Sequence, residues 1–291
     1  MPSRYASVFR PGLFAGQAAI VTGGGSGLGR CAAHELASLG ARVALLGRKP
    51  EKLDNVRAEI ESAAGEARCY VCDIREEETV RQTISRVIAD LGRVDALVNN
   101  AGGQFAAPLE SISAKGWDAV VRTNLTGGFL MARECYTQWM KQAAGKGNAG
   151  AIVNIIADMW QGMPTMGHSG AARAGMLNFT ETAAVEWAPI RVNAVAPGWI
   201  ASSGLDNYPP EMAAHIKSLP KHVPLGRLGT ESEVSAAICY LLSPAAAFVS
   251  GSCIRVDGAV PNAKRPGALM SKGKTEAFNG FHLASKPKVL D

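Results

Sequence analysis

The feature that most constrains the fold is a glycine-rich turn between a short apolar run and a helix-forming segment. Residues 18–22 are AAIVT, and Gly23, Gly27 and Gly29 follow within TGGGSGLG, before an Ala/Leu-rich stretch that ends at Gly40. Such glycines let the backbone approach a pyrophosphate, and the N-terminus of the following helix supplies free N–H groups. The turn therefore predicts a dinucleotide site inside a β-α-β unit.

The rest of the chain repeats the same order of strand and helix. Its apolar runs are short and do not alternate with polar residues, which is typical of strands buried on both faces of a parallel sheet. A chain of 291 residues is long enough for one large core. We expect an α/β fold with a single Rossmann-type, doubly wound parallel sheet of about seven strands and helices on both faces. The later predicted strands are 42–47, 67–73, 95–100, 151–156, 191–197 and 252–258.

Composition changes only near the C-terminus. We expect residues 1–259 to form the dinucleotide-binding catalytic domain, with a substrate loop at about 198–223 whose prolines suit a lid. Residues 260–291 are richer in Lys, Ser, Gly and Asn and are expected to be a C-terminal extension of that domain. The extension is either a loosely ordered terminus or an arm that packs on a neighbouring subunit.

Charge, hydropathy and cysteine usage exclude several classes of function. The net charge of +5 is dispersed, without the basic stripe that nucleic-acid binding requires. The sequence shows neither a signal peptide nor an apolar run long enough to cross a membrane. Its six cysteines are scattered, and Cys69 and Cys72 point to opposite faces of a strand, so that we expect reduced thiols and no metal. The protein is expected in the cytoplasm.

Two cations follow the second predicted strand, where a site for an unphosphorylated ribose would place an acid. Gly47 is followed there by Arg48 and Lys49. A guanidinium is a planar fork that matches a 2′-phosphate, whereas a carboxylate would repel it. We therefore expect NADP(H) as the cofactor.

Further motifs follow the other strands. Asp73 is placed to meet an adenine edge, and NNAG at 99–102, NLTG at 124–127 and Pro197-Gly198 complete the series. In this order the motifs resemble the short-chain dehydrogenase/reductase family over residues 14–258. The cofactor-binding residues that we expect are Gly23, Ser26, Gly27, Leu28, Gly29, Arg48, Lys49, Asp73, Asn100, Ala101, Gly102, Arg173, Pro197 and Gly198.

The catalytic residues of that family are a serine, a Tyr-x-x-x-Lys pair and an asparagine, and this chain keeps only Asn124. Ala157 stands in the serine's place, Ser169 in the tyrosine's and Arg173 in the lysine's. The tyrosine donates a proton to a carbonyl oxygen, for which serine is too weak an acid, and arginine does not give up its charge. Ordinary ketone reduction is therefore disfavoured.

A reaction that needs hydrogen-bond donors but no strong acid suits these residues better. Hydride addition to the far carbon of an α,β-unsaturated thioester develops an enolate, whose carbon water can protonate. The phrases NNAGGQF, AIVNII and HSGAARAGM resemble the peroxisomal trans-2-enoyl-CoA reductases, and Ser169-x-x-x-Arg173 is similar to the Ser-x-x-x-Lys of 2,4-dienoyl-CoA reductases. We expect NADPH-dependent reduction of a 2-enoyl or dienoyl acyl thioester, with Asn124, Ser169 and Arg173 as catalytic residues.

Three other functions remain open. Relatives of this branch are assigned to oxidation of acyclic terpene alcohols such as citronellol, and loss of the usual residues is typical of a non-catalytic NADP-binding protein. Residues 167–171, GHSGA, nearly match the nucleophile elbow of a hydrolase, with His168 and Asp158 close by, but about a dozen loop residues separate Ser169 from the strand. We expect His168 to be a loop or supporting residue rather than a proton donor. Asp158 is expected to be structural or near the nicotinamide amide.

Small residues also predict an assembly. The expected helix 169–187 carries many alanines and Gly175, which permit close packing on more than one side. In the resembled family, this helix and the one near 117–141 form subunit interfaces. We therefore expect a homotetramer that acts on a small molecule.

Overall fold

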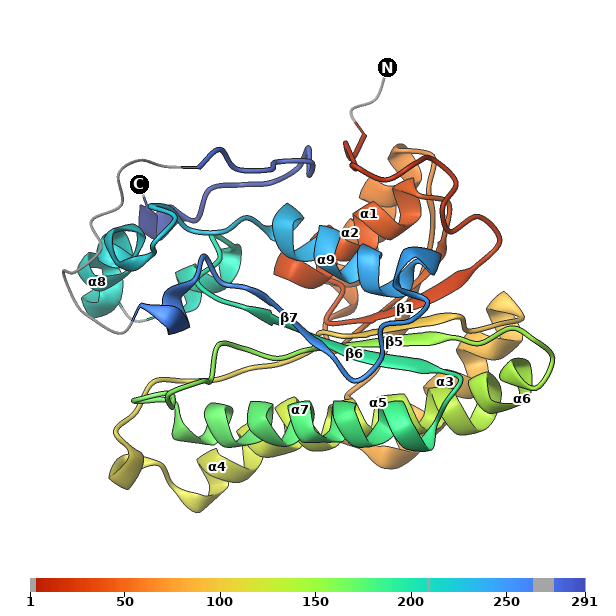
Figure 1. Ribbon diagram of the computed structural model, residues 1–291, viewed down its shortest axis with the longest axis horizontal. Coiled ribbons are helices and arrows are strands. Elements are labelled where there is room, and N and C mark those ends of the chain that lie inside the picture. The colour runs from red at the N-terminus through yellow and green to blue at the C-terminus, as the bar shows by residue number, and fades with distance from the viewer. Residues whose placement is uncertain (1–3, 209, 264–274, 291) are drawn as a thin grey trace.

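The computed structural model describes residues 4–208, 210–263 and 275–290. Within them, seven strands form one sheet in the order β3-β2-β1-β4-β5-β6-β7, and every pair of neighbours is parallel (Figure 1). The strands are β1 (Ala18–Thr22), β2 (Arg42–Gly47), β3 (Glu66–Val71), β4 (Ala96–Asn99), β5 (Ala151–Ile155), β6 (Arg191–Pro197) and β7 (Cys253–Val256). The predicted doubly wound α/β fold is confirmed.

Helices cover both faces of this sheet (Figure 1). Those described are α1 (Gly27–Ser38), α2 (Pro50–Ser62), α3 (Glu77–Leu91), α4 (Ala114–Val121), α5 (Gly127–Cys135), α6 (Lys141–Ala144), α7 (Gly167–Glu186), α8 (Ala213–Ser218) and α9 (Glu231–Leu242). The expected helix near 117–141 is the run from α4 to α6, whose turns widen to π-helix at Arg122–Thr126 and Tyr136–Met140. The first of these wide turns contains Asn124.

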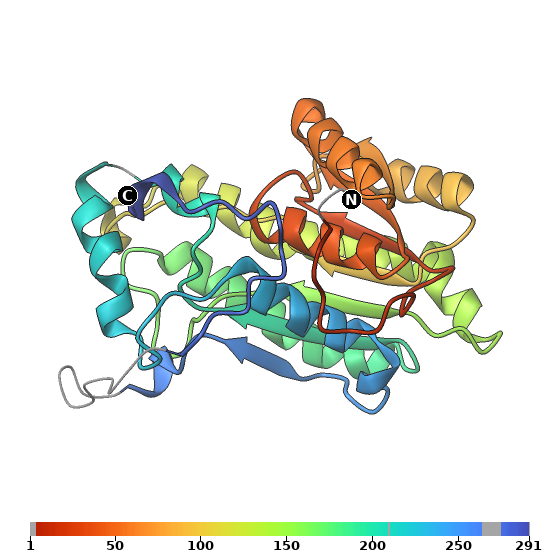
Figure 2. The same ribbon diagram turned by 90° about the horizontal axis from the view of Figure 1, so that it is seen from above.

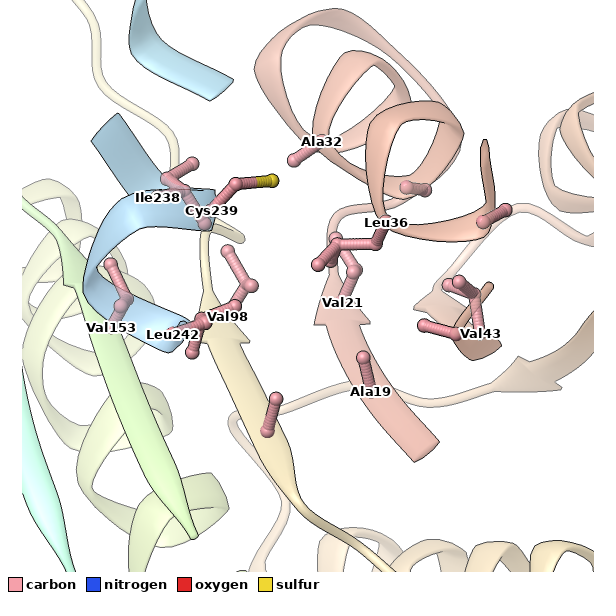
Figure 3. Packing of buried hydrophobic residues seen from close by; sticks show 14 of the residues in the cluster. Ala19, Val21, Ala32, Leu36, Val43, Val98, Val153, Ile238, Cys239 and Leu242 are labelled. Atoms are coloured by element: carbon pink, nitrogen blue, oxygen red, sulfur yellow. The ribbon is translucent and has the colours of Figure 1, made fainter. Parts of the chain in front are cut away.

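Alternate strand residues point to opposite faces and build two cores. Ala19 and Val21 pack with α1, α2 and α9 on one face (Figure 3). Ala18 and Ile20 pack with α3, α5 and α7 on the other. Burial of both faces explains why the strands show no polar alternation. The carboxyl ends of the strands share one edge of the sheet, which is where ligands bind in open α/β sheets.

The expected substrate loop is largely helical. Besides α8, residues 198–223 contain short 3₁₀ segments at Ser203–Asn207, Pro210–Met212 and Leu219–His222. Ile216 and Leu219 are buried there, and Trp199 packs against them. This region, which we call the lid, lies beyond the end of the sheet (Figures 1 and 2).

The described part of the C-terminal extension, residues 275–290, folds back on the chain's own body. Phe281 is 3% exposed and stacks on Tyr5. Val289 and Leu290 pack into the lid cluster beside α8 (Figure 2). A loosely ordered terminus is therefore the wrong interpretation for these residues, because their apolar side chains are buried. Residues 264–274 and 291 of the extension lie outside the described residues.

Candidate active site

The glycine turn after β1 has the close backbone approach that its sequence predicts. Gly23 and Gly27 have φ angles of +66° and +55°, which favour glycine. A Cβ atom on Gly29 would collide with the Gly23 carbonyl oxygen and would lie 2.5 Å from Asn100 Nδ2. The turn can therefore accept no side chain at Gly29 without moving α1 away from the strand ends.

Hydrogen bonds join this turn to the end of β4. Asn100 Nδ2 donates to the Thr22 carbonyl oxygen at 2.9 Å, and Thr22 Oγ1 accepts from the main-chain N–H groups of Asn100 and Ala101, each at 2.9 Å. Ser26 is the N-cap of α1, and its side chain makes no capping bond. The first N–H groups of α1 are thus free of a side-chain cap and can meet an anion.

A cavity of about 300 Å³ lies over these strand ends. Eight of the expected cofactor residues line it: Gly23, Ser26, Arg48, Lys49, Asp73, Asn100, Ala101 and Gly102. Lys52, Arg75 and Thr123 also line it and were missed by the sequence analysis, which considered only the residues directly after each strand. The dimensions and the bare backbone fit the pyrophosphate of a dinucleotide.

Positive charge gathers at the end of the cavity formed by β2 and β3. Arg48, Lys49, Lys52 and Arg75 all line it. Asp73, expected at the adenine edge, accepts from Arg75 Nε at 2.9 Å, and this contact holds the pKa of Asp73 below its ordinary value. The Asp73 carboxylate is therefore ionised, and its charge is balanced by Arg75. Among the described residues, Arg48, Lys49 and Lys52 remain as unbalanced positive charge in the lining, which suits a phosphate.

The expected residues outside this lining have other contacts. Gly27, Leu28 and Gly29 begin α1, and Leu28 packs against the core. A Cβ atom on Gly198 would lie 2.7 Å from Asp257 Cα, so that the glycine permits β6 and β7 to end close together. Pro197 ends β6, and its carbonyl oxygen accepts from the Asp158 N–H at 3.3 Å.

Two of the expected catalytic residues, Ser169 and Arg173, lie near the start of α7, which we call the reaction end of the candidate site. Ser169 is fully buried, and its hydroxyl donates to Gln104 Oε1 at 2.7 Å. Because Ser169 lies inside a helix and well beyond β5, no nucleophile elbow is present at Gly167–Ala171. The hydrolase interpretation is therefore excluded for this serine.

Arg173 lies one turn after Ser169, and no described carboxylate pairs with it. Its Nη1 donates to the Ile155 carbonyl oxygen at 2.6 Å, and its Nη2 would lie 2.5 Å from a Cβ atom placed on Gly102. Burial lowers the pKa of Arg173 to about 10, so that the guanidinium stays charged at neutral pH. Its Nε is buried and has no partner among the described residues.

Asn124 supports the loop that follows β4. Its Oδ1 accepts from the Gly103 N–H and its Nδ2 donates to the Gly103 carbonyl oxygen, both at 2.9 Å. The side chain is buried by the wide turn after α4. Asn124 thus holds the main chain next to Gln104, a contact that the sequence analysis did not foresee.

His168 and Asp158, the two other polar residues considered near Ser169, each carry a buried atom without a partner in the described part of the chain. His168 Nδ1 accepts from the Ser169 N–H at 2.8 Å, which leaves the proton on Nε2, and the ring of Phe105 meets it edge-on at 4.4 Å between centroids. Asp158 Oδ1 is likewise unpaired, and burial together with Asp257 raises the pKa of its carboxyl.

One further side chain reaches this end from the lid. Gln104 Nε2 donates to the hydroxyl oxygen of Tyr208 at 3.1 Å. Neither residue was predicted to belong to the site, because no local pattern joins positions that are 104 residues apart. Gln104 immediately follows NNAGG, which is the only signal that could have drawn attention to it.

The described residues also bear on two expected absences. None of their helices is long and apolar enough to cross a membrane. Nor do any three His, Cys, Asp or Glu side chains among them gather as metal ligands do. All six cysteines are free.

Comparisons with known proteins agree with this geometry. A family model described as enoyl-(acyl carrier protein) reductase matches residues 23–260. A probable 2,4-dienoyl-CoA reductase of Bacillus subtilis is 37% identical over 246 residues, which are 83% of this chain and 95% of that protein. A peroxisomal 2,4-dienoyl-CoA reductase of Danio rerio is 34% identical over 263 residues, which are 88% and 85% of the two chains.

Solved structures are similar along most of the chain. A citronellol catabolism dehydrogenase of Pseudomonas aeruginosa PAO1 is 57% identical with a TM-score of 0.78, covering 88% of this chain and 100% of that one. An actinorhodin polyketide ketoreductase variant with NADPH is 30% identical with a TM-score of 0.78, covering 87% and 100%.

Proposed function

The chain belongs to the short-chain dehydrogenase/reductase family, and within that family we propose that it uses NADPH to reduce an α,β-unsaturated acyl thioester. One observation carries this proposal. A buried serine and a carboxylate-free arginine occupy the places of the family's tyrosine and lysine at the start of α7. Such a site offers hydrogen bonds and positive charge but no strong acid on α7, and an enolate needs no more.

The cavity at the strand ends supports a phosphorylated cofactor. The bare turn at Gly23 and Gly29 suits the pyrophosphate, and Arg48 among its neighbouring cations suits the 2′-phosphate. When bound, the reduced nicotinamide supplies a hydride. Arg173, next to Gly102 in the cavity lining, holds the nicotinamide ribose in place of the family's lysine.

The chain's own residues act on the substrate oxygen. We propose that the thioester carbonyl is bound near the Ser169 hydroxyl and its partner Gln104, where a hydrogen-bond donor stabilises the charge that develops on the oxygen. Asn124 positions the loop after β4 by hydrogen-bonding the main chain of Gly103. The lid at 198–223 covers the acyl chain, and we assign the extension at 260–291 to the same catalytic domain as residues 1–259.

The test compares substrates directly. NADPH oxidation is followed by absorbance with crotonyl-, decenoyl- and dienoyl-CoA, and reduction of NADP is followed with citronellol. We expect turnover with at least one enoyl thioester. Ser169→Ala should lower that turnover by about 10- to 10³-fold with NADPH affinity nearly unchanged, since the hydroxyl network matters chiefly in the transition state. Ser62→Ala, an exposed serine that bonds its own helix, is the matched control. Full activity of Ser169→Ala would contradict this role.

A second candidate is supported by the identity of 57% to the citronellol catabolism dehydrogenase. Oxidation of an acyclic terpene alcohol requires a group that accepts the alcohol proton. Ser169 and Arg173 do not supply that group. Turnover of citronellol alone in the assay above would favour this candidate and reject the thioester.

We further propose a homotetramer that works in the cytoplasm. Six free cysteines suit a reducing compartment. Large apolar side chains are exposed at Trp117 on α4, at Val185 on α7 and at Phe248, with exposures of 36%, 80% and 104%. Exposed apolar groups of this size suit subunit contacts. Light scattering at micromolar concentration tests the assembly, and a monomeric mass would reject it.

A further inference from the structure

The reaction proposed above leaves the donor to the substrate oxygen to be identified. The family's asparagine is already engaged with the main chain, because Asn124 Oδ1 accepts from the Gly103 N–H and Nδ2 gives one of its two protons to the Gly103 carbonyl oxygen. The proton of Ser169 is also committed, since the hydroxyl donates to Gln104 Oε1 at 2.7 Å. His168 Nε2 and Arg173 Nε also lack partners among the described residues, but both atoms are buried. An accessible donor therefore has to come from another residue at this end of the site.

Tyr208 of the lid is placed to be that donor. Its hydroxyl oxygen accepts from Gln104 Nε2 at 3.1 Å, so that one amide group separates it from the Ser169 hydroxyl. Gln104 is exposed and Tyr208 is half-buried, which leaves both accessible to a ligand. The three side chains come from the loop after β4, from α7 and from the lid.

The hydrogen bonds that join Ser169, Gln104 and Tyr208 form a row that runs in one direction, which leaves one hydroxyl proton free. Ser169 gives its proton to the Gln104 oxygen, and the Gln104 nitrogen gives one of its protons to the Tyr208 oxygen. No described residue accepts the proton of Tyr208 itself. A phenol is also a stronger acid than an aliphatic alcohol and is the better partner for an oxygen that gains negative charge.

We propose that Tyr208 is a catalytic residue that donates a hydrogen bond to the carbonyl oxygen of the substrate, with Gln104 and Ser169 as the positioning residues that direct its proton. The inference rests on the proposed function, because it requires a carbonyl oxygen that gains charge. In this role Tyr208 keeps its phenolic proton, because it donates a hydrogen bond and does not transfer the proton. The lid thus supplies the hydroxyl that α7 lacks.

Packing fixes the position of this tyrosine. Tyr208 lies in the apolar cluster of the lid with Trp199 and Met212. The 3₁₀ segment before it is tied to the C-terminal extension, because the Val289 N–H donates to Asp206 Oδ1 at 3.0 Å. A donor held in this way loses little entropy when the oxygen develops charge.

The first test separates Tyr208 from its neighbours. With the best enoyl-CoA among crotonyl-, decenoyl- and dienoyl-CoA, Tyr208→Phe should lower kcat by about 10²-fold, since removal of one such donor costs about 10²- to 10³-fold. Its KM and its Kd for NADPH should change less than about threefold, because the bond strengthens only in the transition state. Tyr240→Phe, on α9, is the matched control and should keep full activity. A full kcat in Tyr208→Phe would overturn the proposal.

The second test changes the direction of the hydrogen bonds at Gln104 and keeps the shape of its side chain. Gln104→Glu replaces the amide with a carboxylate that only accepts, so that it captures the protons of both Ser169 and Tyr208. We expect kcat to fall by at least about 10-fold, approaching the effect of Tyr208→Phe, with unchanged affinity for NADPH. A merely structural role for Gln104 would tolerate this isosteric change, and an unaltered kcat would overturn the proposed row.

The outcome for the wild type keeps the two proposals distinct. If the wild type reduces citronellal and no enoyl thioester, the proposed function is wrong. The role of Tyr208 is then decided by the same kcat comparison with citronellal, where Tyr208→Phe should again lose about 10²-fold. If the wild type reduces neither, both proposals are overturned.

Discussion

The cofactor end of the site is held by contacts between neighbouring strand ends, whereas the reaction end is held by side chains from three distant segments. At the cofactor end, Asn100 bonds Thr22 across two adjacent strands, and most of the lining residues lie just after β1 to β4. At the reaction end, Ser169 bonds Gln104 over 65 positions and Gln104 bonds Tyr208 over 104. One end follows from sheet topology, and the other depends on how the lid closes over it. Changes at one end should therefore leave the other nearly unaffected.

The largest effect is expected from a side chain in the glycine turn. In Gly29→Ala the new Cβ atom meets the Gly23 carbonyl oxygen, which is backbone and cannot move aside. Overpacking of this kind costs about 1 to 3 kcal/mol. We expect the Kd for NADPH to rise by about 10- to 100-fold, measured by fluorescence titration. Gly145→Ala, where only Gln142 O lies within 4 Å of the new atom, is the control. Unchanged NADPH binding in Gly29→Ala would contradict the assignment of the turn.

Removal of Arg48 should separate the two nicotinamide cofactors. The wild type should prefer NADPH over NADH by about 10-fold or more, since a charge-assisted contact contributes about 1.5 to 3 kcal/mol. Arg48→Ala should lose that preference while its Kd for NADH stays nearly constant. Arg68→Ala, an exposed arginine on β3, is the control. Equal affinity of the wild type for both cofactors would reject NADP(H) as the natural partner.

A charge in the C-terminal extension should affect the reaction end alone. Leu290 packs into the lid cluster, so Leu290→Asp places an unpaired carboxylate against apolar side chains. We expect KM for the acyl substrate to rise by about fivefold, which corresponds to about 1 kcal/mol, with the Kd for NADPH unchanged. Leu283→Asp, at an exposed position of the same extension, is the control. An equal loss of NADPH affinity would show that the two ends are not independent.

The smallest effect is expected from pH at the glycine turn. Burial raises the pKa of Glu231 to about 7, and this carboxyl lies beside Gly27. The folded state therefore binds this proton more tightly than the unfolded state, so the free energy of unfolding should fall as pH rises from about 4.5 to about 7. Ionised Glu231 also repels a diphosphate, and affinity for NADPH should fall by about threefold above pH 7.

Glu231→Gln separates this carboxyl from every other titrating group. The variant should show neither the loss of stability between pH 4.5 and 7 nor the loss of NADPH affinity above pH 7, because the amide carries no charge at any pH. Thermal unfolding and fluorescence titration over this range measure both. A pH dependence in Glu231→Gln equal to that of the wild type would reject Glu231 as its source.

Most of the fold and of the cofactor end was predictable from the sequence. Unalternating apolar strands fix a parallel sheet, and the parallel sheet brings the residues after each strand to one edge. For this reason Gly23, Arg48 and Asn100 could be assigned by position alone. Lys52 was missed because it lies one helical turn beyond the strand end and reaches back into the cavity.

The reaction end was predictable only in its missing groups. The sequence shows that Ser169 and Arg173 stand where the family has tyrosine and lysine. It does not show which side chains contact Ser169 in the folded protein. Gln104 contacts Ser169, and Tyr208 contacts Gln104 through folding of the lid, which depends on burial of Ile216 and on the extension rather than on local pattern. The lid was expected to be a loop, because its prolines conceal the short helix at 213–218.

The fate of the hydride tests the central claim most directly. The wild type is incubated with NADPH that carries deuterium at both C4 positions and with its best enoyl-CoA substrate, and the product is analysed by mass spectrometry. Our account predicts one deuterium at the far carbon of the conjugated system, which is C3 of a 2-enoyl chain or C5 of a 2,4-dienoyl chain, and none at the carbon that takes its proton from water. An acyl chain without deuterium at that far carbon, or label found only in an alcohol carbon, would contradict it.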